Sequence, residues 1–446
     1  MSTSRIKIEV NHLKEGMYIA DLDCPWHQTP FPLQGFYIRT DDDVKALAGY
    51  CKHVYVDERK ARVKYVYENR VVTKPDPATQ KKQSATIEEI DEPQVVILAP
   101  LVIKAPQSYE TNTSIKKEAA RASKLHQHVY EAITGIFDTL YKGEDVSIAQ
   151  TETVAEGMVE SIVRNPDALV WLSKMSEEDV YSYQHSVKSS IWALVYGRHL
   201  GLDKSLLKTL AMGVLLSHIG KAKLPSELRD KHEAFSADEM SIYQNYVDYS
   251  VGILDEIEGL PSGVVSVVKF HQERHNGTGY PQGVTGGRIP LLAKIAGLVD
   301  YYQSLINPRD GTQGLSPLQA VSKLYELRNI AFQDDLVERF IEAVGVYPTG
   351  TLVELSSHEV AIVTGHNLDR RLLPKVIIVL DDHKYPLKNA KVVDLKEWNR
   401  DKIGDEGLYI SESLPKGAYN IDENKFLLTG AKSRWSWKHF SGSIAS

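Results

Sequence analysis

Helical apolar periodicity fills the chain from residue 115 to residue 345, and no other feature restricts the possible fold as much. Apolar residues recur there at steps of three and four, in segments of about 10–20 residues. Prolines lie between these segments, at Pro225, Pro261, Pro281 and Pro290. Because proline lacks the backbone donor that a helix interior needs, these positions indicate helix boundaries. The pattern predicts a multi-helix bundle over residues 115–345.

The regions on either side of this bundle have a different pattern. With 446 residues the chain is too long for one ordinary core. Residues 5–10 alternate polar and apolar, and Gly and Pro separate the short strand-like pieces that follow, which predicts a small α+β domain over 1–72. After the bundle, TLVELSSHEVAIVTGHN and LLPKVIIVLDDHKYPL are typical of strands and predict a β-rich subdomain over 346–446. The expected fold class is therefore mainly α, with these two smaller parts.

Residues 73–114 have the composition of a linker. The stretch from Thr73 onward is polar and contains proline, without an apolar period, which predicts a flexible linker. It encloses one apolar run, VVILAPLVI at 95–103, and the sequence does not show where that run docks. Near the other end of the chain, the aromatic and basic string SRWSWKHF is interpreted as a docking edge.

Charge and cysteine content exclude several classes of protein. A net charge of -7 argues against a partner that is a nucleic-acid polymer. The two cysteines, Cys24 and Cys51, form neither a CxxC pair nor a disulfide framework, which favours a reducing, cytoplasmic location. The N-terminus lacks the apolar run of a signal peptide, and the run at 95–103 is too short to span a membrane. The oligomeric state stays open.

Four local signatures follow one another within the bundle. They are His185 in YSYQHSVKSS, LLSHIGKAKLP at 215–225, FHQERHNGTGYPQG at 270–283, and IAGLVDYYQSL at 295–305. A lone histidine on a helix is more often a packed or surface residue, so the first signature is weak. The third is strong, because it places a histidine, an arginine and a glycine-rich loop side by side.

In order and spacing these signatures resemble the HD-GYP family, a branch of the HD metal-dependent phosphohydrolases. Residues 14–26 and 54–57 also resemble the small domain that often precedes HD-GYP domains. The resemblance implies an HD-type helical bundle in which histidine and aspartate hold two or three iron or manganese ions. It also implies cyclic di-GMP as substrate. Paired metals suit this chemistry because they stabilise both the attacking and the leaving oxygen of a phosphodiester.

The match to the family's active form is uneven. Where the family has the His-Asp dyad of LLHDIGK, this chain has Ser217 and His218. Gln272 replaces the second histidine of HHER, and Tyr246 stands where family enzymes have another histidine. An imidazole cannot bridge two metals as a carboxylate does. The chain therefore resembles a cyclic di-GMP phosphodiesterase, but we expect it to be inactive.

Three residues remain at the family's metal positions, namely His185, His271 and Asp300. Two histidines and a carboxylate can hold one divalent iron or manganese ion, with His218 as a fourth ligand. The alternative is that no metal binds. In that case the three residues form a hydrogen-bonded polar pocket, and His218 or His271 neutralises Asp300.

The positions that contact nucleotide in the family are better preserved. The resemblance implies a ligand-binding set, which comprises Lys221, Arg274, Gly279, Tyr280, Pro281 and Arg309. Such arginines engage phosphate or stack on a base, and a lysine supplies a point charge. The same residues are also consistent with solvated surface charges and a turn that needs its backbone geometry.

These observations favour a degenerate HD-GYP protein in bacterial cyclic di-GMP signalling, which binds nucleotide or partner proteins with little or no hydrolysis. The resemblance also makes signalling proteins of the diguanylate cyclase type possible partners, through the loop that contains Tyr280. Two alternatives stay open: a weak metal-dependent phosphodiesterase, and an inert scaffold that acts through its N- and C-terminal parts.

Overall fold

A computed structural model describes residues 5–24, 26, 29, 35–38, 41–57, 96, 98, 101–175, 181–365, 367, 372–400, 407–414 and 418–421. The chain divides into two compact units, Met1–Val95 and Val96–Ser446. The predicted docking edge SRWSWKHF lies outside the described residues. The domain boundaries predicted after residues 72, 114 and 345 stay predictions.

The first unit contains a four-stranded antiparallel sheet in its described part, in the order β1-β4-β2-β3. Alternating apolar residues of these strands, such as Ile8, Ile19 and Val54, are buried. This part is the small α+β fold that the sequence predicts. Its elements are β1 (Arg5–Glu9), η1 (Val10–His12), β2 (Tyr18–Leu22), β3 (Phe36–Tyr37), α1 (Asp41–Ala48) and β4 (His53–Asp57).

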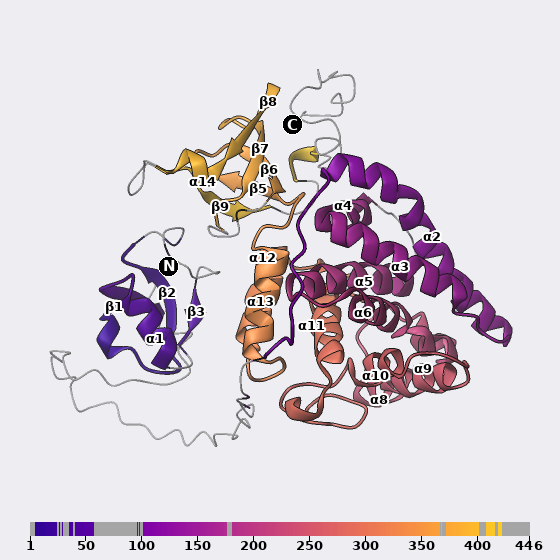
Figure 1. Ribbon diagram of the computed structural model, residues 1–446. Coiled ribbons are helices and arrows are strands. Elements are labelled where there is room, and N and C mark those ends of the chain that lie inside the picture. The colour runs from indigo at the N-terminus through magenta and orange to yellow at the C-terminus, as the bar shows by residue number, and fades with distance from the viewer. Residues whose placement is uncertain are drawn as a thin grey trace, which may run out of the picture. The chain divides into compact units, whose positions relative to one another are not determined.

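The second unit is mainly helical and confirms the mainly α fold class (Figure 1). Its helices are α2 (Ile115–Lys142), α3 (Ala149–Arg164), α4 (Pro166–Met175), α5 (Tyr181–His199), α6 (Lys204–Leu216), η3 (Ile219–Lys223), α7 (Ser226–Arg229), α8 (Ala237–Gln244), α9 (Tyr246–Asp255), α10 (Ser262–Phe270), η4 (Gly286–Arg288), α11 (Leu291–Ile306), α12 (Pro317–Glu326) and α13 (Asp334–Val344). Three of the prolines named above directly precede α7, α10 and α11, as helix boundaries require.

Helix α5 is central to this body, since it packs against α6, α11 and α13. Aromatic side chains fill the space between these helices. The ring of Tyr302 on α11 lies 5.9 Å from that of Trp192 on α5 and 5.0 Å from that of Phe340 on α13. Tyr196 on α5 donates its hydroxyl to the backbone oxygen of Leu336, so the buried phenol is satisfied. This core fixes α5 relative to α11, and these two helices carry His185 and Asp300.

An antiparallel five-stranded sheet follows the helices, in the order β8-β7-β6-β5-β9. Its buried residues include Val360, Ile362 and Ile377. The β-rich tail is therefore confirmed within the described residues. Its elements are β5 (Leu352–Leu355), β6 (Val360–Gly365), β7 (Lys375–Leu380), β8 (Pro386–Asp394), α14 (Leu395–Trp398), β9 (Ile410–Ser413) and η6 (Ala418–Asn420).

Residues 101–114, which end the predicted linker, contact the helical body. The Tyr109 hydroxyl donates to Leu202 O at 2.8 Å, and Arg198 Nη2 donates to Tyr109 O at 2.7 Å. Within the apolar run at 95–103, the Val96 amide donates to Asn329 O at 2.9 Å. This bond shows where Val96 of that run docks.

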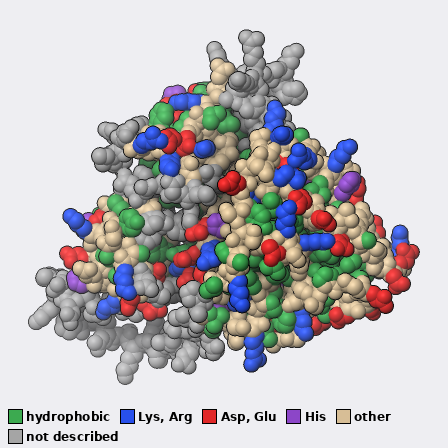
Figure 2. All heavy atoms as spheres, in the orientation of Figure 1, with side chains coloured by type: hydrophobic (Ala, Val, Ile, Leu, Met, Phe, Trp, Pro, Cys, Tyr) green, Lys and Arg blue, Asp and Glu red, His purple; other side chains and the backbone are tan. Residues whose placement is uncertain are grey.

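The exposed surface of the helical body carries both signs of charge. On the face seen in Figure 2, Lys and Arg side chains are interspersed with Asp and Glu side chains. This face has no continuous basic patch, in agreement with the net charge of -7. Among the described residues, no helix has both the length and the apolar character that crossing a membrane requires.

Candidate functional site

Three buried side chains from three elements meet inside the helical body. His185 comes from α5, His218 from the turn between α6 and η3, and Asp300 from α11. His185 Nε2 lies 2.7 Å from Asp300 Oδ1, and His218 Nε2 lies 3.3 Å from the same oxygen. Each of the three offers an atom that could bind a metal, and these atoms all lie within 4.8 Å of one another. The sequence grouped His185, His271 and Asp300, with His218 as a fourth ligand, and the side chains that converge are those of His185, His218 and Asp300.

The turn that presents His218 depends on small residues. Helix α6 ends at Leu216, and the Ser217 hydroxyl donates back to Val214 O at 2.8 Å, so it does not face the site. The next turn runs close to α9, because Gly220 N donates to Ser250 Oγ at 2.8 Å. A Cβ atom at Gly220 would lie 2.1 Å from Tyr246 O, so only glycine fits there.

The second oxygen of Asp300 is bound by Gln272, whose Nε2 donates to Oδ2 at 2.8 Å. The amide oxygen of Gln272 accepts from Arg274 Nη2 at 2.9 Å. Because arginine only donates and a carboxylate only accepts, these two neighbours fix the orientation of the amide. Asp300 is thus surrounded by three side-chain nitrogens, those of His185, His218 and Gln272.

The charges in this cluster follow from burial and from these contacts. Burial alone would raise the pKa of Asp300, but His185 and His218 hold it well below its usual range. Burial, reinforced by the nearby Lys221 ammonium, holds the pKa of His218 well below its ordinary value. A neutral His218 with its proton on Nε2 can donate to Asp300 while Nδ1 accepts from the Ser186 hydroxyl at 3.3 Å. The cluster is therefore an ionised carboxylate among donors.

His271 lies beside this cluster but is not one of the three residues that converge. Its Nδ1 lies 2.7 Å from Val268 O and its Nε2 lies 3.1 Å from the Tyr246 hydroxyl. The arrangement fits a neutral ring that donates from Nδ1 and accepts at Nε2. Burial lowers the pKa of His271 to about 4, which agrees with the neutral form. In this arrangement the Tyr246 hydroxyl donates to Nε2 of His271, and Nε2 is the atom with which His271 would bind a metal.

The cationic side chains expected to bind nucleotide are largely engaged within the protein. Arg274 Nη1 donates to Glu273 O at 3.0 Å and to His271 O at 3.2 Å. Arg309 donates to the backbone oxygens of Lys231 and Glu233, and its guanidinium carbon lies 4.0 Å from the centre of the Phe235 ring.

Lys221 differs from the two arginines because its ammonium lies over aromatic rings. It is 5.0 Å from the ring centre of Tyr246 and 5.5 Å from that of Tyr243. The Phe235 ring lies 4.7 Å from that of Tyr243 and extends the row of aromatic side chains. Lys221 itself is buried, whereas Phe235 and Tyr243 are half-buried.

The loop that contains Gly279, Tyr280 and Pro281 is held by Glu273, which sequence reasoning did not select. The Glu273 carboxylate accepts from Gln282 N at 2.8 Å and from Val284 N at 3.1 Å. A Cβ atom at Gly279 would lie 2.3 Å from Arg274 N, so the loop passes too close for any other residue. The signal that could have identified Glu273 is its place between Gln272 and Arg274 in the HQER string.

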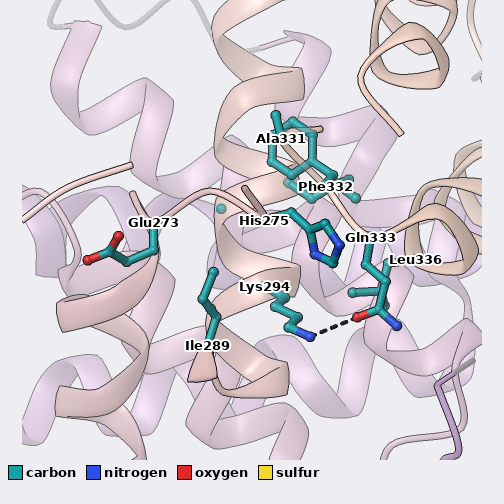
Figure 3. Close-up of a pocket in the computed structure, with 10 residues that line it drawn as sticks. Glu273, His275, Ile289, Lys294, Ala331, Phe332, Gln333 and Leu336 are labelled. Atoms are coloured by element: carbon teal, nitrogen blue, oxygen red, sulfur yellow. Dashed lines mark hydrogen bonds between the residues drawn. The ribbon is translucent and has the colours of Figure 1, made fainter. Parts of the chain in front are cut away.

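A separate pocket lies beside Glu273 (Figure 3). It is lined by Glu273, His275, Ile289, Lys294, Gly297, Leu298, Ala331, Phe332, Gln333 and Leu336. The ammonium of Lys294 donates to Gln333 Oε1 at 2.7 Å. Of the residues proposed from the sequence for metal or ligand, none lines this pocket.

The donors present do not fit a pair of bridged metal ions. A second ion beside Asp300 would need acceptor ligands of its own, but the side chain at Oδ2 is the amide of Gln272, which donates an N–H there at 2.8 Å. The side chains at the replaced positions also point to other partners: Ser217 to Val214 and Tyr246 to His271. A single ion held by His185, His218 and Asp300 would be compatible with the donor types.

Two family models match the chain. Residues 5–151 match a domain of unknown function, DUF3391, and residues 167–332 match the HD domain. The cyclic di-GMP phosphodiesterase PA4108 of Pseudomonas aeruginosa is 25% identical over 393 residues, which cover 87% of this chain and 88% of that protein. The cyclic di-GMP phosphodiesterase PdeB of Borreliella burgdorferi is 25% identical over 249 residues, 56% of this chain and 64% of that protein.

Among solved structures, Bd1817, an HD-GYP-type protein of Bdellovibrio bacteriovorus, aligns with a TM-score of 0.43 and 15% identity. The alignment covers 76% of this chain and 98% of that one. The two family models follow one another along the sequence in the order that the motifs predict. The chain therefore contains an HD domain behind a DUF3391 region, and along most of its length it is similar to a cyclic di-GMP phosphodiesterase.

Proposed function

We propose that this HD-domain protein binds cyclic di-GMP in a signalling role and hydrolyses it little or not at all. The observation that carries the proposal is the environment of Asp300, whose two oxygens are met by His185, His218 and Gln272. The choice of nucleotide rests on PA4108 and PdeB, two relatives that are named cyclic di-GMP phosphodiesterases.

The proposed loss of hydrolysis follows from the chemistry of the site. Phosphodiester hydrolysis by paired metals uses both ions to stabilise the attacking and leaving oxygens. Here both oxygens of the buried, ionised carboxylate already accept hydrogen bonds from the protein, so the cost of burying it is offset without a metal ion. His218, which replaces the family's aspartate, is one of those donors. A single divalent iron or manganese ion on His185, His218 and Asp300 remains part of the proposal, as a structural ion.

Nucleotide recognition is assigned to the group formed by Lys221, Tyr243 and Arg309. Lys221 offers an ammonium close to the cluster, and Arg309 lies 5.8 Å from the ring centre of Tyr243. A cyclic dinucleotide carries two phosphates and two purine faces, which match a cation beside aromatic rings. Arg274 then acts indirectly, because its guanidinium holds the amide of Gln272.

Calorimetry with cyclic di-GMP tests the proposal, together with a turnover assay on the same preparation. We expect binding of the full-length protein and no appreciable turnover when Mn²⁺ or Fe²⁺ is supplied under reducing conditions. Lys221→Met keeps the length of the side chain and removes the charge, so we expect binding to weaken by about 1.5–3 kcal/mol. The matched control is Lys223→Met, an exposed lysine on the same turn of η3.

Each other result contradicts a part of the proposal. Unchanged affinity in Lys221→Met removes the proposed nucleotide site. Absence of binding in the wild type refutes the receptor role and favours a scaffold that acts through its N- and C-terminal parts. Rapid turnover that disappears in Asp300→Asn identifies a working phosphodiesterase, in which the cluster is catalytic.

A further inference from the structure

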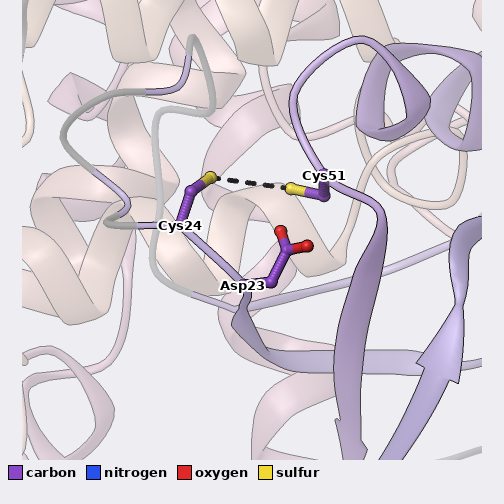
Figure 4. A group of neighbouring side chains, drawn as sticks. All are labelled: Asp23, Cys24 and Cys51. Carbon is purple, nitrogen blue, oxygen red and sulfur yellow. Dashed lines mark hydrogen bonds between the residues drawn. The ribbon is translucent and has the colours of Figure 1, made fainter.

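Three side chains with metal-binding atoms converge in the first unit, far along the sequence from the HD domain. They are Asp23, Cys24 and Cys51, and Figure 4 shows them pointing toward one another. Asp23 and Cys24 directly follow β2, and Cys51 precedes β4. Because β2 and β4 pair antiparallel, with Leu22 opposite Val54, the end of one strand lies beside the start of the other. The pairing of β2 with β4 therefore brings Asp23, Cys24 and Cys51 together, and no motif in the sequence indicates this group.

The carboxylate of Asp23 is held in place by the backbone. Its Oδ2 accepts from Lys52 N at 2.9 Å and from His53 N at 3.1 Å, and His53 Nδ1 lies 3.2 Å from the same oxygen. All three contacts are made to Oδ2, and none of them involves Oδ1. Carboxylates that bind a metal are commonly held in place by such hydrogen bonds.

The distance between the sulfurs indicates what the group could hold. Cys24 Sγ and Cys51 Sγ are 3.8 Å apart. A disulfide needs about 2.0 Å, so the pair is not bonded. Two thiolates on one tetrahedral Zn²⁺, each about 2.3 Å from the ion, are about 3.8 Å apart. The metal-binding atoms of Asp23, Cys24 and Cys51 all lie within 4.8 Å of one another, as one ion requires.

We propose that Asp23, Cys24 and Cys51 bind a thiophilic divalent cation of the Zn²⁺ class, with His53 orienting the carboxylate. Two thiols become thiolates on binding, so two protons leave as the cation enters. Cys51 is buried and Cys24 is half-buried, which leaves a way in on the Cys24 side. The ion ties the end of β2 to the turn that leads into β4, and solvent takes the fourth position.

Cobalt spectroscopy tests the proposal on the full-length protein. The protein is stripped with a chelator, kept under a phosphine reductant and titrated with Co²⁺ as a probe of the Zn²⁺ site. We expect a thiolate-to-cobalt charge-transfer band in the near ultraviolet, saturating at one ion per chain and abolished by Zn²⁺. A histidine and carboxylate site gives no such band, so ions bound at His185, His218 and Asp300 do not interfere.

Three variants make the assay specific. Cys24→Ser, Cys51→Ser and Asp23→Asn should each weaken Co²⁺ binding by at least about 100-fold, since losing even an outer contact costs about 10–100-fold. Asp255→Asn, at an exposed position at the end of α9, should leave the band unchanged. Circular dichroism confirms that each variant is folded; Cys24→Ser is the safest, because Cys24 is only half-buried.

The proposal fails if the reduced wild type shows no thiolate band, or if Cys24→Ser keeps it. It also fails if the two thiols oxidise readily to a disulfide while the reduced protein binds no Co²⁺. That result would make Cys24 and Cys51 a redox pair.

Discussion

Replacement of Asp300 by asparagine should destabilise the helical body even when no metal is present. The carboxylate accepts from His185 and His218 at one oxygen and from Gln272 at the other. An amide of the same shape offers one oxygen and one NH₂ group, so its NH₂ must face a donor. Hydrogen bonds to a charged group contribute about 1.5–3 kcal/mol each, and an unpaired buried donor costs about 1–3 kcal/mol. Because the contributions of neighbouring hydrogen bonds do not add fully, we expect Asp300→Asn to lower the free energy of unfolding by about 3–5 kcal/mol.

Urea denaturation followed by circular dichroism measures this loss, at neutral pH in the presence of a chelator. The control is Asp255→Asn, an exposed residue at the end of α9, which should change the free energy of unfolding by less than about 0.5 kcal/mol. The reasoning is refuted if Asp300→Asn loses less than about 1 kcal/mol in chelator. It is refuted equally if the loss appears only after Mn²⁺ or Fe²⁺ is added, because a metal would then be the partner of the carboxylate.

Two further predictions concern the structure around the site. Burial lowers the pKa of His126 on α2 to about 4, below the value of about 6.5 in an unfolded chain. Below pH 6.5 the unfolded chain binds the extra proton, so stability should fall by up to about 3 kcal/mol as the pH drops to 4. Denaturation across that window should show a smaller fall in His126→Gln, whereas the exposed neighbour His128→Gln should behave like the wild type. Glu273→Gln replaces one acceptor of the loop amides by a donor. It should lower stability by about 1–3 kcal/mol and speed hydrogen exchange at Gln282 and Val284, and unchanged exchange would contradict this role.

The order of elements could be predicted from the sequence because it depends on local patterns. Three- and four-residue apolar steps and prolines at boundaries marked the helices, alternation marked the first strand, and strand-like segments with tight turns marked the C-terminal sheet. The family resemblance predicted that His185 and Asp300 share a site, and in the structure His185 Nε2 lies 2.7 Å from Asp300 Oδ1.

What could not be predicted depends on the partner that each polar group finds in three dimensions. Arg274 and Arg309 were expected to face a nucleotide, yet their donors bind backbone oxygens and the amide of Gln272. Their ligand-binding role stays a prediction. His271 was grouped with the metal positions, but the sequence could not show that Tyr246 reaches its Nε2.

The cysteines illustrate the same limit. Cys24 and Cys51 are 27 residues apart, without the short spacing by which metal sites are identified in a sequence. Only the pairing of β2 with β4 brings them together. Sequence patterns report which residues share an element, whereas a site of this kind arises from strand register.

Metal analysis of the full-length protein, purified without oxygen, tests the central claim most directly. The claim is that donors from the protein have replaced the paired metals around Asp300. It predicts that the protein carries no pair of iron or manganese ions per chain, and that adding either metal creates none. A stoichiometric pair of iron or manganese ions that disappears in Asp300→Asn would contradict the claim.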